Sequence, residues 1–156
     1  MLPASFSGYQ IVKKGNIILR LTDLQNDQRS LRVGLVKDDK GIITSAYIGL
    51  VFKKDLIPTY FYYLIHYYDI AKVFYWQGGG LRQSMTFDDV KILPVIIPPQ
   101  KEQLAIANYL DRKTTHIDKI TATITEQITT LKELRKTLIN DVVTGKICVT
   151  DDKLTK

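Results

Sequence analysis

Apolar residues recur every seven positions through the C-terminal third of this chain. Counting in sevens gives an aliphatic residue each time, at Leu110, Ile117, Ile124, Leu131 and Leu138. The companion position of each heptad carries Ile106, Lys113, Ile120, Gln127 and Leu134, so two of the companions are polar. The pattern predicts a long helix that pairs with one partner helix along a coiled-coil seam. About 45 helical residues would extend over roughly 65 Å, which suits a spacer better than a catalyst.

The predicted seam contains seven aliphatic side chains and one amide. Its members are Leu110, Ile117, Ile120, Ile124, Gln127, Leu131, Leu134 and Leu138. The seam can be covered either by the globular part of the same chain or by another molecule. The helix is too long to be covered by so small a globular part, so we favour an intermolecular partner.

Proline and glycine mark the ends of the predicted helix. Pro99 stands at a first-turn position, where the missing N–H costs nothing, and Gly145 is a suitable C-terminal stop. The polar run around Thr114 and Thr115 allows a kink or a break. We therefore predict a globular domain over residues 1–98, a long-helix spacer over residues 99–147 and a polar tail over residues 148–156.

Short β-branched segments precede the predicted spacer. Strands are expected over Ile17–Leu21, Leu31–Val36, Ile42–Phe52 and Val95–Ile97. Helices are expected from Pro58 onwards, over Ile70–Tyr75 and over Asp88–Leu93. Strands and helices mix without βαβ regularity, which predicts an α+β domain followed by the long helix.

The charge of the chain is compatible with nucleic-acid binding. The formal net charge is +6, and residues 1–98 carry 12 basic against 8 acidic side chains, compared with 10 against 8 in the remainder. A basic surplus concentrated on the globular part suits a domain that faces DNA. Many equally basic proteins bind no nucleic acid, so charge alone does not decide the question.

The sequence predicts neither catalytic nor metal-binding residues. Cys148 is the single cysteine, and neither His66 nor His116 has a carboxylate or histidine at metal-ligand spacing. The glycine run at 78–80 lacks the lysine of a phosphate-binding P-loop. We find no nuclease-like acidic cluster, methylation motif, membrane-spanning apolar run or signal peptide. These features predict a cytoplasmic protein.

Several segments in a fixed order resemble the specificity subunit of type I restriction–modification systems. The first group is "RLTDLQNDQRSLRVG", "GIITSAY" and "GGGLRQSMTFDDVKILPV", which is similar to the later part of a target recognition domain. The second group is Pro98-Pro99, Glu102-Gln103, "IANYLD", "IDKI", "LKELRKTLI" and "VVTGKI", which is similar to the conserved helical spacer. The resemblance extends from about Tyr9 to Ile147. The ordered set is specific, although no single segment is diagnostic.

The resemblance implies a DNA-reading and scaffolding role. Such subunits recognise a bipartite double-stranded DNA site and hold two modification subunits, through which the restriction subunit is recruited. S-adenosylmethionine, Mg and ATP are implied only for those partner subunits, and none is implied for this chain. A full specificity subunit resembles two recognition domains with two spacers that pair antiparallel. Compared with that pattern, the resemblance implies one spacer and an incomplete recognition domain in this chain, so its helix is expected to pair with a second copy or another specificity half.

Two polar patches are the candidates for DNA contact. Amide and guanidinium side chains can form paired hydrogen bonds with adenine and guanine edges, and glycines permit close approach to phosphate. The first patch comprises Arg20, Thr22, Gln25, Asn26, Arg29 and Arg32. The second comprises Gly79, Arg82, Gln83 and Ser84. The alternatives are a polar turn capped by Asp23 and Asn26, an ion pair at Arg20 inside the domain, and a plain flexible glycine loop.

Two further surfaces have competing interpretations. The tyrosines at 60, 62, 63, 67 and 68 can stack on unpaired bases or, more commonly, pack around the core. Residues 93–97, with Lys101, Gln103 and Asn108 on the following helix, are a candidate docking face for a modification subunit. Val95 and Ile97 can instead fill the core.

The favoured function is that of a non-catalytic DNA-specificity half-subunit. The alternative is a truncated remnant that acts only as a helical dimerisation or interaction module and no longer reads DNA.

Overall fold

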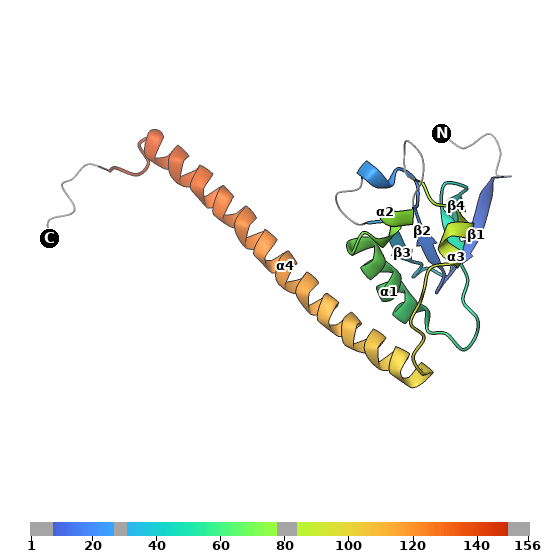
Figure 1. Cartoon of the computed structure of the whole chain (residues 1–156). Helices are drawn as coiled ribbons and strands as arrows, with labels where there is room; N and C mark the ends of the chain where they lie inside the picture. Colours follow the sequence, from blue (N-terminus) through green and yellow to red (C-terminus); the bar gives the residue numbers. More distant parts are fainter. Residues whose placement is uncertain (1–7, 27–30, 78–83, 150–156) are drawn as a thin grey trace. The chain divides into compact units, whose positions relative to one another are not determined.

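The computed structural model describes residues 8–26, 31–77 and 84–149 (Figure 1). Its packing divides the chain into a first unit, Met1–Leu110, and a second unit, Asp111–Lys156. The division falls after Leu110 rather than at the 98/99 boundary that the sequence predicts, because the first turns of the long helix pack within the first unit. The fold class is α+β, as predicted.

Two small antiparallel sheets form the β part of the first unit (Figure 1). β1 (Tyr9–Lys13) pairs with β4 (Lys40–Thr44), and Ile11 lies opposite Ile42. In the other sheet β2 (Ile17–Leu19) lies between β3 (Val33–Leu35) and β5 (Ile48–Leu50). The turn between β1 and β2 contains Gly15 at φ +87°, a left-handed conformation that favours glycine.

Three segments differ from the predicted strands. Ile42–Phe52 is not one strand, since a turn in which the Tyr47 N–H donates to the Thr44 carbonyl at 3.2 Å separates β4 from β5. Val95–Ile97 is not a strand and runs as irregular chain. Tyr9–Lys13, for which no strand is predicted, forms β1.

The helices begin close to their sequence signals. α1 (Pro58–Ile70) opens on proline, α2 (Val73–Gln77) follows it, and a short 3₁₀ helix η1 (Leu24–Asn26) precedes β3. α3 (Phe87–Lys91) follows Thr86, whose N–H and hydroxyl both donate to the Asp89 carboxylate, at 2.7 and 2.8 Å. These hydrogen bonds lower the pKa of Asp89 below its ordinary value.

α4 (Gln100–Val143) is one continuous helix of 44 residues, without a break at Thr114 or Thr115. Gly145 follows its end at φ +75°, and its N–H donates to the Val142 carbonyl at 3.1 Å. The proline start and the glycine stop are therefore where the sequence predicts them. Among the described residues, no helix is both long and apolar enough to cross a membrane.

The core of the first unit is built between the β2 sheet and the helices. Ile17 and Leu19 from β2 are fully buried, as is Phe74 from α2. Phe61 and Ile65 from α1 and Ala107 from α4 belong to the same cluster. The first turns of α4 are thereby fixed within the compact unit.

Candidate nucleic-acid interface

The loop after β2 alternates buried anchors with exposed polar side chains. Leu21 and Leu24 are buried, whereas Arg20, Thr22 and Asn26 are exposed. Because the anchors occupy the core, the backbone between them is held against the domain and the polar side chains face outwards. Three candidates of the first patch thus lie on one exposed loop.

Asp23 gives this loop its sharp turn. Its φ of 61° is left-handed, a conformation that aspartate tolerates better than most side chains. The Asn26 side-chain amide donates to Asp23 Oδ1 at 2.9 Å, and the Asn26 N–H donates to the Asp23 carbonyl at 3.3 Å. The loop is therefore a turn closed by Asp23 and Asn26, through one bond between their side chains and one between their main chains, while Arg20 and Thr22 stay exposed.

Arg32 is not on the exposed face, which corrects its assignment as a DNA contact. It is 9% exposed. Its Nη1 donates to the carbonyls of Arg20 at 3.1 Å and Thr22 at 2.5 Å, and Nη2 donates to the carbonyl of Asp23 at 2.7 Å. A guanidinium is placed here to satisfy loop carbonyls, and we remove Arg32 from the DNA-contacting set. Arg20, which the alternative made part of a buried ion pair, is exposed.

The described end of the second patch adjoins the first. Ser84 is exposed, and the N–H of the next residue, the buried Met85, donates to the Leu21 carbonyl at 2.9 Å. The structure therefore brings Ser84 beside the Arg20–Thr22 stretch, although more than sixty residues separate them in the sequence. Arg29, Gly79, Arg82, Gln83 and the side chain of Gln25 lie outside the described part of the chain, and their DNA contacts stay predictions.

The tyrosine-rich helix serves mainly to pack the domain. The Tyr60 hydroxyl donates to the Ile96 carbonyl at 3.0 Å, and the Tyr68 hydroxyl donates to the Pro94 carbonyl at 2.5 Å. Burial raises the pKa of Tyr60, with smaller contributions from Glu102 and Tyr68. Tyr67 is 61% exposed. Two of the tyrosines thus hold the irregular segment that leads to α4.

The candidate docking face requires two corrections. Gln103 is 2% exposed, so it does not face outwards with Lys101 and Asn108. Val95 and Ile97 are 43% and 58% exposed, so they do not fill the core. Instead, residues 92–97 present an apolar surface to which Ile92 and Ile96 also contribute.

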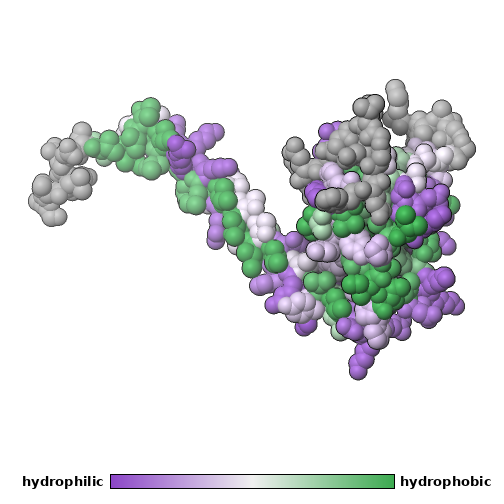
Figure 2. Space-filling model, viewed as in Figure 1, coloured by the Kyte–Doolittle hydropathy of each residue, from purple (hydrophilic) through white to green (hydrophobic). Residues whose placement is uncertain are grey.

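The side chains of the predicted seam in the second unit are exposed in the single chain. The exposed fractions are 59% for Ile117, 46% for Ile120, 50% for Ile124, 64% for Leu131, 59% for Leu134 and 56% for Leu138, and Gln127 is also exposed. Figure 2 shows apolar surface along this helix. Leu110, the first seam residue, is half-buried in the first unit.

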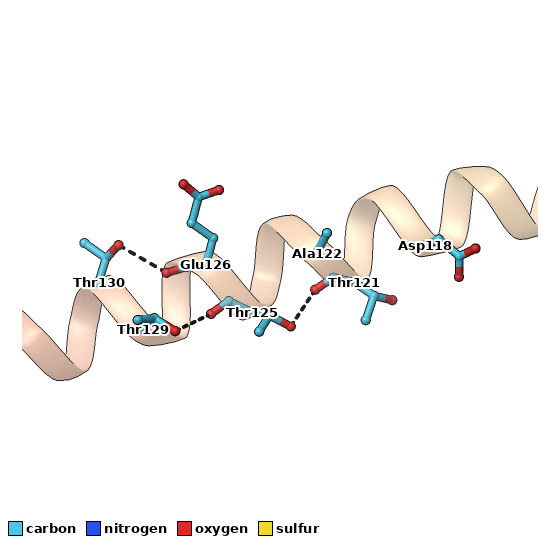
Figure 3. A pocket seen from close by; sticks show the side chains of 7 residues that line it. All are labelled: Asp118, Thr121, Ala122, Thr125, Glu126, Thr129 and Thr130. Carbon is cyan, nitrogen blue, oxygen red and sulfur yellow. Dashed lines mark hydrogen bonds between the residues drawn. The ribbon is translucent and has the colours of Figure 1, made fainter. Parts of the chain in front are cut away.

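Threonines on α4 satisfy their own hydroxyls. Figure 3 shows the hydroxyls of Thr125, Thr129 and Thr130 donating to the carbonyls of Thr121, Thr125 and Glu126, at 2.8, 3.0 and 3.1 Å. Thr121 donates to the Ile117 carbonyl at 2.9 Å in the same way. A threonine bonded to the carbonyl four residues earlier needs no polar partner, so a packed helix can cover it without an unsatisfied hydroxyl.

A family model described as a type I restriction modification DNA specificity domain matches residues 5–130. The chain belongs to this family. The match runs from the segment before β1 well into the second unit, so the specificity domain includes both the globular part and more than half of the long helix. Searches of curated proteins and of solved structures found no match.

In this specificity domain, the polar residues that shape the loop after β2 carry no local sequence signal. Asp69 is fully buried on α1, and its Oδ2 accepts the Arg32 N–H at 2.9 Å. Nothing near Asp69 in the sequence indicates that partner, 37 residues earlier. Among the described residues, no group of three or more His, Cys, Asp or Glu side chains is placed to hold a metal ion.

Proposed function

We propose that this chain is a DNA-reading and scaffolding half-subunit of a type I restriction–modification complex and catalyses no reaction itself. The observation that carries the proposal is the family match across residues 5–130, which includes a globular domain and part of a long helix. The methyl donor, Mg and ATP belong to partner subunits in this proposal. The complex acts in the cytoplasm, on double-stranded DNA.

The loop geometry supports DNA reading at the face that carries Arg20, Thr22, Asn26 and Ser84. These side chains combine one guanidinium, one amide and two hydroxyls, the groups that bind phosphate oxygens and base edges. All four are exposed, and the two loops that carry them are joined by the Met85–Leu21 hydrogen bond. Arg29, Gln25, Gly79, Arg82 and Gln83 are proposed to extend the same face.

Replacing Arg20, Arg29 and Arg82 together by alanine is expected to weaken DNA binding and to flatten its salt dependence. Each phosphate contact that is lost should lower the slope of log K against log salt by about one. The measurement is fluorescence anisotropy with a pool of random-sequence duplexes, using the chain assembled with its modification subunits, across a salt titration.

The control for this variant removes the same charge elsewhere. Lys37, Lys53 and Lys54 are exposed and lie outside both loops, so their triple alanine variant should retain most of the binding and the original slope. Equal slopes for the wild-type chain and the arginine variant would contradict DNA contact by these loops. That result would favour the alternative function, a helical dimerisation module that does not read DNA.

The apolar segment 92–97 and the adjacent start of α4 are proposed to bind a modification subunit. Such a subunit must be held near the DNA-reading face if it is to act on the base that this face selects. Ile92, Ile96 and Ile97 are 66%, 69% and 58% exposed, which leaves hydrophobic surface available to a partner.

Reversing the charge of Lys101 and replacing Asn108 by arginine is expected to reduce co-purification with the modification subunit several-fold. Both residues are exposed, so the melting temperature of the chain should stay nearly unchanged. The measurement is affinity capture of the co-expressed modification subunit. Lys132→Glu is the control, because this exposed lysine lies in the second unit. Equal recovery with the double variant would exclude this face.

The second-unit helix is proposed to pair with a second copy of the chain or with another specificity half. A self-paired antiparallel helix makes an isologous contact and implies two recognition domains related by two-fold symmetry. The corresponding DNA site is bipartite, and it is palindromic when the two halves are identical. The exposure of the seam between Ile117 and Leu138 supports this arrangement.

A further inference from the structure

The Arg32 side chain binds three backbone carbonyls of the candidate DNA-reading loop, residues 20–26. On the basis of the proposed function, we propose that Arg32 is a positioning residue: it fixes the conformation of residues 20–26, and base discrimination depends on it although it is not itself a DNA contact. Its guanidinium is turned towards the loop backbone and is bonded to the carbonyls of Arg20, Thr22 and Asp23.

The chemistry of the guanidinium suits this task. Arginine offers a planar, rigid set of N–H donors, so it can satisfy several carbonyls in one fixed arrangement. A lysine in the same place has the same charge but lacks that planar arrangement. The backbone adds a reciprocal contact, because the Arg20 N–H donates to the Arg32 carbonyl at 2.9 Å. Arg20 and Arg32 are therefore held together through both main chain and side chain.

The position of Arg32 is in turn fixed by the core. Its N–H donates to Asp69 Oδ2 at 2.9 Å, and Asp69 is 0% exposed on α1. The same helix buries Phe61 and Ile65 in the hydrophobic cluster. A shift of the loop backbone would therefore break contacts that continue into the core.

The side chains proposed to contact DNA face solvent, whereas the side chain that holds their loop in place is buried. Arg20, Thr22 and Asn26 are exposed, whereas Arg32 is 9% exposed. Both terminal nitrogens of the Arg32 guanidinium donate to loop carbonyls and the residue is buried, so Arg32 should make little direct contact with phosphates. Fixing a loop in its bound conformation lowers the ordering cost of binding. A base edge is recognised only when its hydrogen-bonding partner is correctly placed. Loss of the hydrogen bonds from Arg32 to the loop should therefore reduce discrimination between DNA sequences more than it reduces general affinity for DNA.

The joined second loop extends the effect. Leu21 lies between Arg20 and Thr22, whose carbonyls both accept hydrogen bonds from Arg32 Nη1. The Leu21 carbonyl itself accepts the Met85 N–H at 2.9 Å. Movement of residues 20–26 would therefore also disturb the hydrogen bond that holds Met85, and with it the neighbouring Ser84.

The test compares two charge-conserving variants, Arg32→Lys and Arg20→Lys. The full chain, assembled with its modification subunits, selects from duplexes with a randomised central region, and the enriched sequences are read out. Binding to the best enriched duplex and to the unselected pool is then measured at several salt concentrations. Arg32→Lys should lower the ratio of these affinities about tenfold, comparable to the loss of one good base contact, with an unchanged salt slope. Arg20→Lys alters a proposed DNA-contacting side chain directly but keeps the carbonyl that Arg32 binds, so any fall in the affinity ratio should leave hydrogen exchange of residues 20–26 as in the wild-type chain.

Hydrogen exchange measures independently whether the hydrogen bonds from Arg32 hold the loop. Amides of residues 20–26 should exchange faster in Arg32→Lys than in the wild-type chain, while amides of Phe61 and Ile65 keep their protection. Asp69→Asn retains an oxygen that can accept the Arg32 N–H and should show a smaller change in the same direction, which keeps the test available if Arg32→Lys folds poorly.

The outcomes distinguish this inference from the proposed function. A wild-type chain that enriches no sequence contradicts DNA reading itself. A wild-type chain that enriches a motif which Arg32→Lys and Asp69→Asn select with equal discrimination overturns the positioning role. A parallel fall of specific affinity, pool affinity and melting temperature also overturns it, because that pattern shows a purely structural residue.

Discussion

Replacing Ile124 and Leu131 together by aspartate is expected to convert a dimer of this chain into a monomer. The two side chains are 50% and 64% exposed in the single chain and stand one heptad apart. Burying a large aliphatic side chain contributes about 1.5–3 kcal/mol, and association costs about 4–15 kcal/mol before any contact is made. Several pairs of seam side chains must therefore be buried together to offset the cost of association. Two carboxylates at these positions would remove two of the apolar contacts and would have to be desolvated, which disfavours the dimer. Sedimentation at micromolar concentration measures the result.

The helix offers a matched control for this double variant. Ala122 and Thr129 are also one heptad apart and exposed, but they lie outside the seam. Ala122→Asp with Thr129→Asp adds the same charge at the same spacing and should leave the dimer intact. Two results would contradict self-pairing: a wild-type chain that sediments as a monomer, or a control pair that dissociates as fully as the seam pair. A monomer would leave another specificity half as the proposed partner.

The long helix could be predicted because its signals are local. The heptad positions, the proline before the first turn and the glycine after the last one all lie within the helix or beside it. Pro58 marks the start of α1 for the same reason. Such signals depend on backbone geometry that adjacent residues determine. The partner of the helix cannot be predicted in the same way, because the residues of this segment do not identify the molecule that covers the seam.

The sheets were predicted less well because strand pairing is non-local. The β-branched stretch from Ile42 to Phe52 has strand propensity throughout, yet its two parts pair with different strands, β1 and β2. Which part pairs where depends on Tyr9–Lys13 and Ile17–Leu19, more than twenty residues away. Val95–Ile97 has the same composition as a strand but runs as irregular chain, held by tyrosine hydroxyls at Pro94 and Ile96. Propensity alone therefore overestimates strands here.

DNA contact stays a prediction for the candidate site, but the structure shows which of its described residues are exposed. Arg20, Thr22, Asn26 and Ser84 are exposed on two joined loops, although neither their exposure nor the joining follows from composition. Arg32 belongs to the same polar run and was misassigned, because exposed and buried arginines look alike until their acceptors are known. In this case the acceptors are backbone carbonyls, which every sequence contains.

Gln103 shows the same limitation at the start of α4. It stands in the first turns of a helix beside charged residues, which suggested an outward face. Its spacing from Ala107 and Leu110, four and seven residues on, was the available signal for the inner face. The structure places its amide between two backbone groups: Oε1 accepts the Ile57 N–H at 3.0 Å, and Nε2 donates to the Pro98 carbonyl at 2.8 Å.

Gln103→Leu is accordingly expected to destabilise the first unit by about 2–5 kcal/mol. Leucine fits a similar volume but leaves the Ile57 N–H and the Pro98 carbonyl, both partly buried, without their side-chain partner. A fully buried polar group left unsatisfied costs about 1–3 kcal/mol, so the two partly buried groups together should cost less than twice the upper limit of that range. That is a large share of the roughly 5–15 kcal/mol that holds a domain folded. Urea denaturation followed by tyrosine and tryptophan fluorescence measures the loss.

The same substitution three residues earlier provides the comparison. Gln100 is the first residue of α4 and is exposed, so Gln100→Leu should change the unfolding free energy by no more than about 0.5 kcal/mol.

Gln103→Glu tests the same site with a charged side chain. Glutamate keeps an acceptor for the Ile57 N–H but loses the donor to the Pro98 carbonyl. It also places a carboxylate at a position that is only 2% exposed, so this variant should also be less stable at neutral pH. Its deficit should shrink as the pH falls and the carboxyl becomes protonated, because the neutral acid can donate to Pro98 again. Equal stability of Gln103→Leu and Gln100→Leu would show that the amide does not fix the start of α4. A deficit confined to the Gln103 variants would show that this one side chain secures the junction between the recognition fold and its helix.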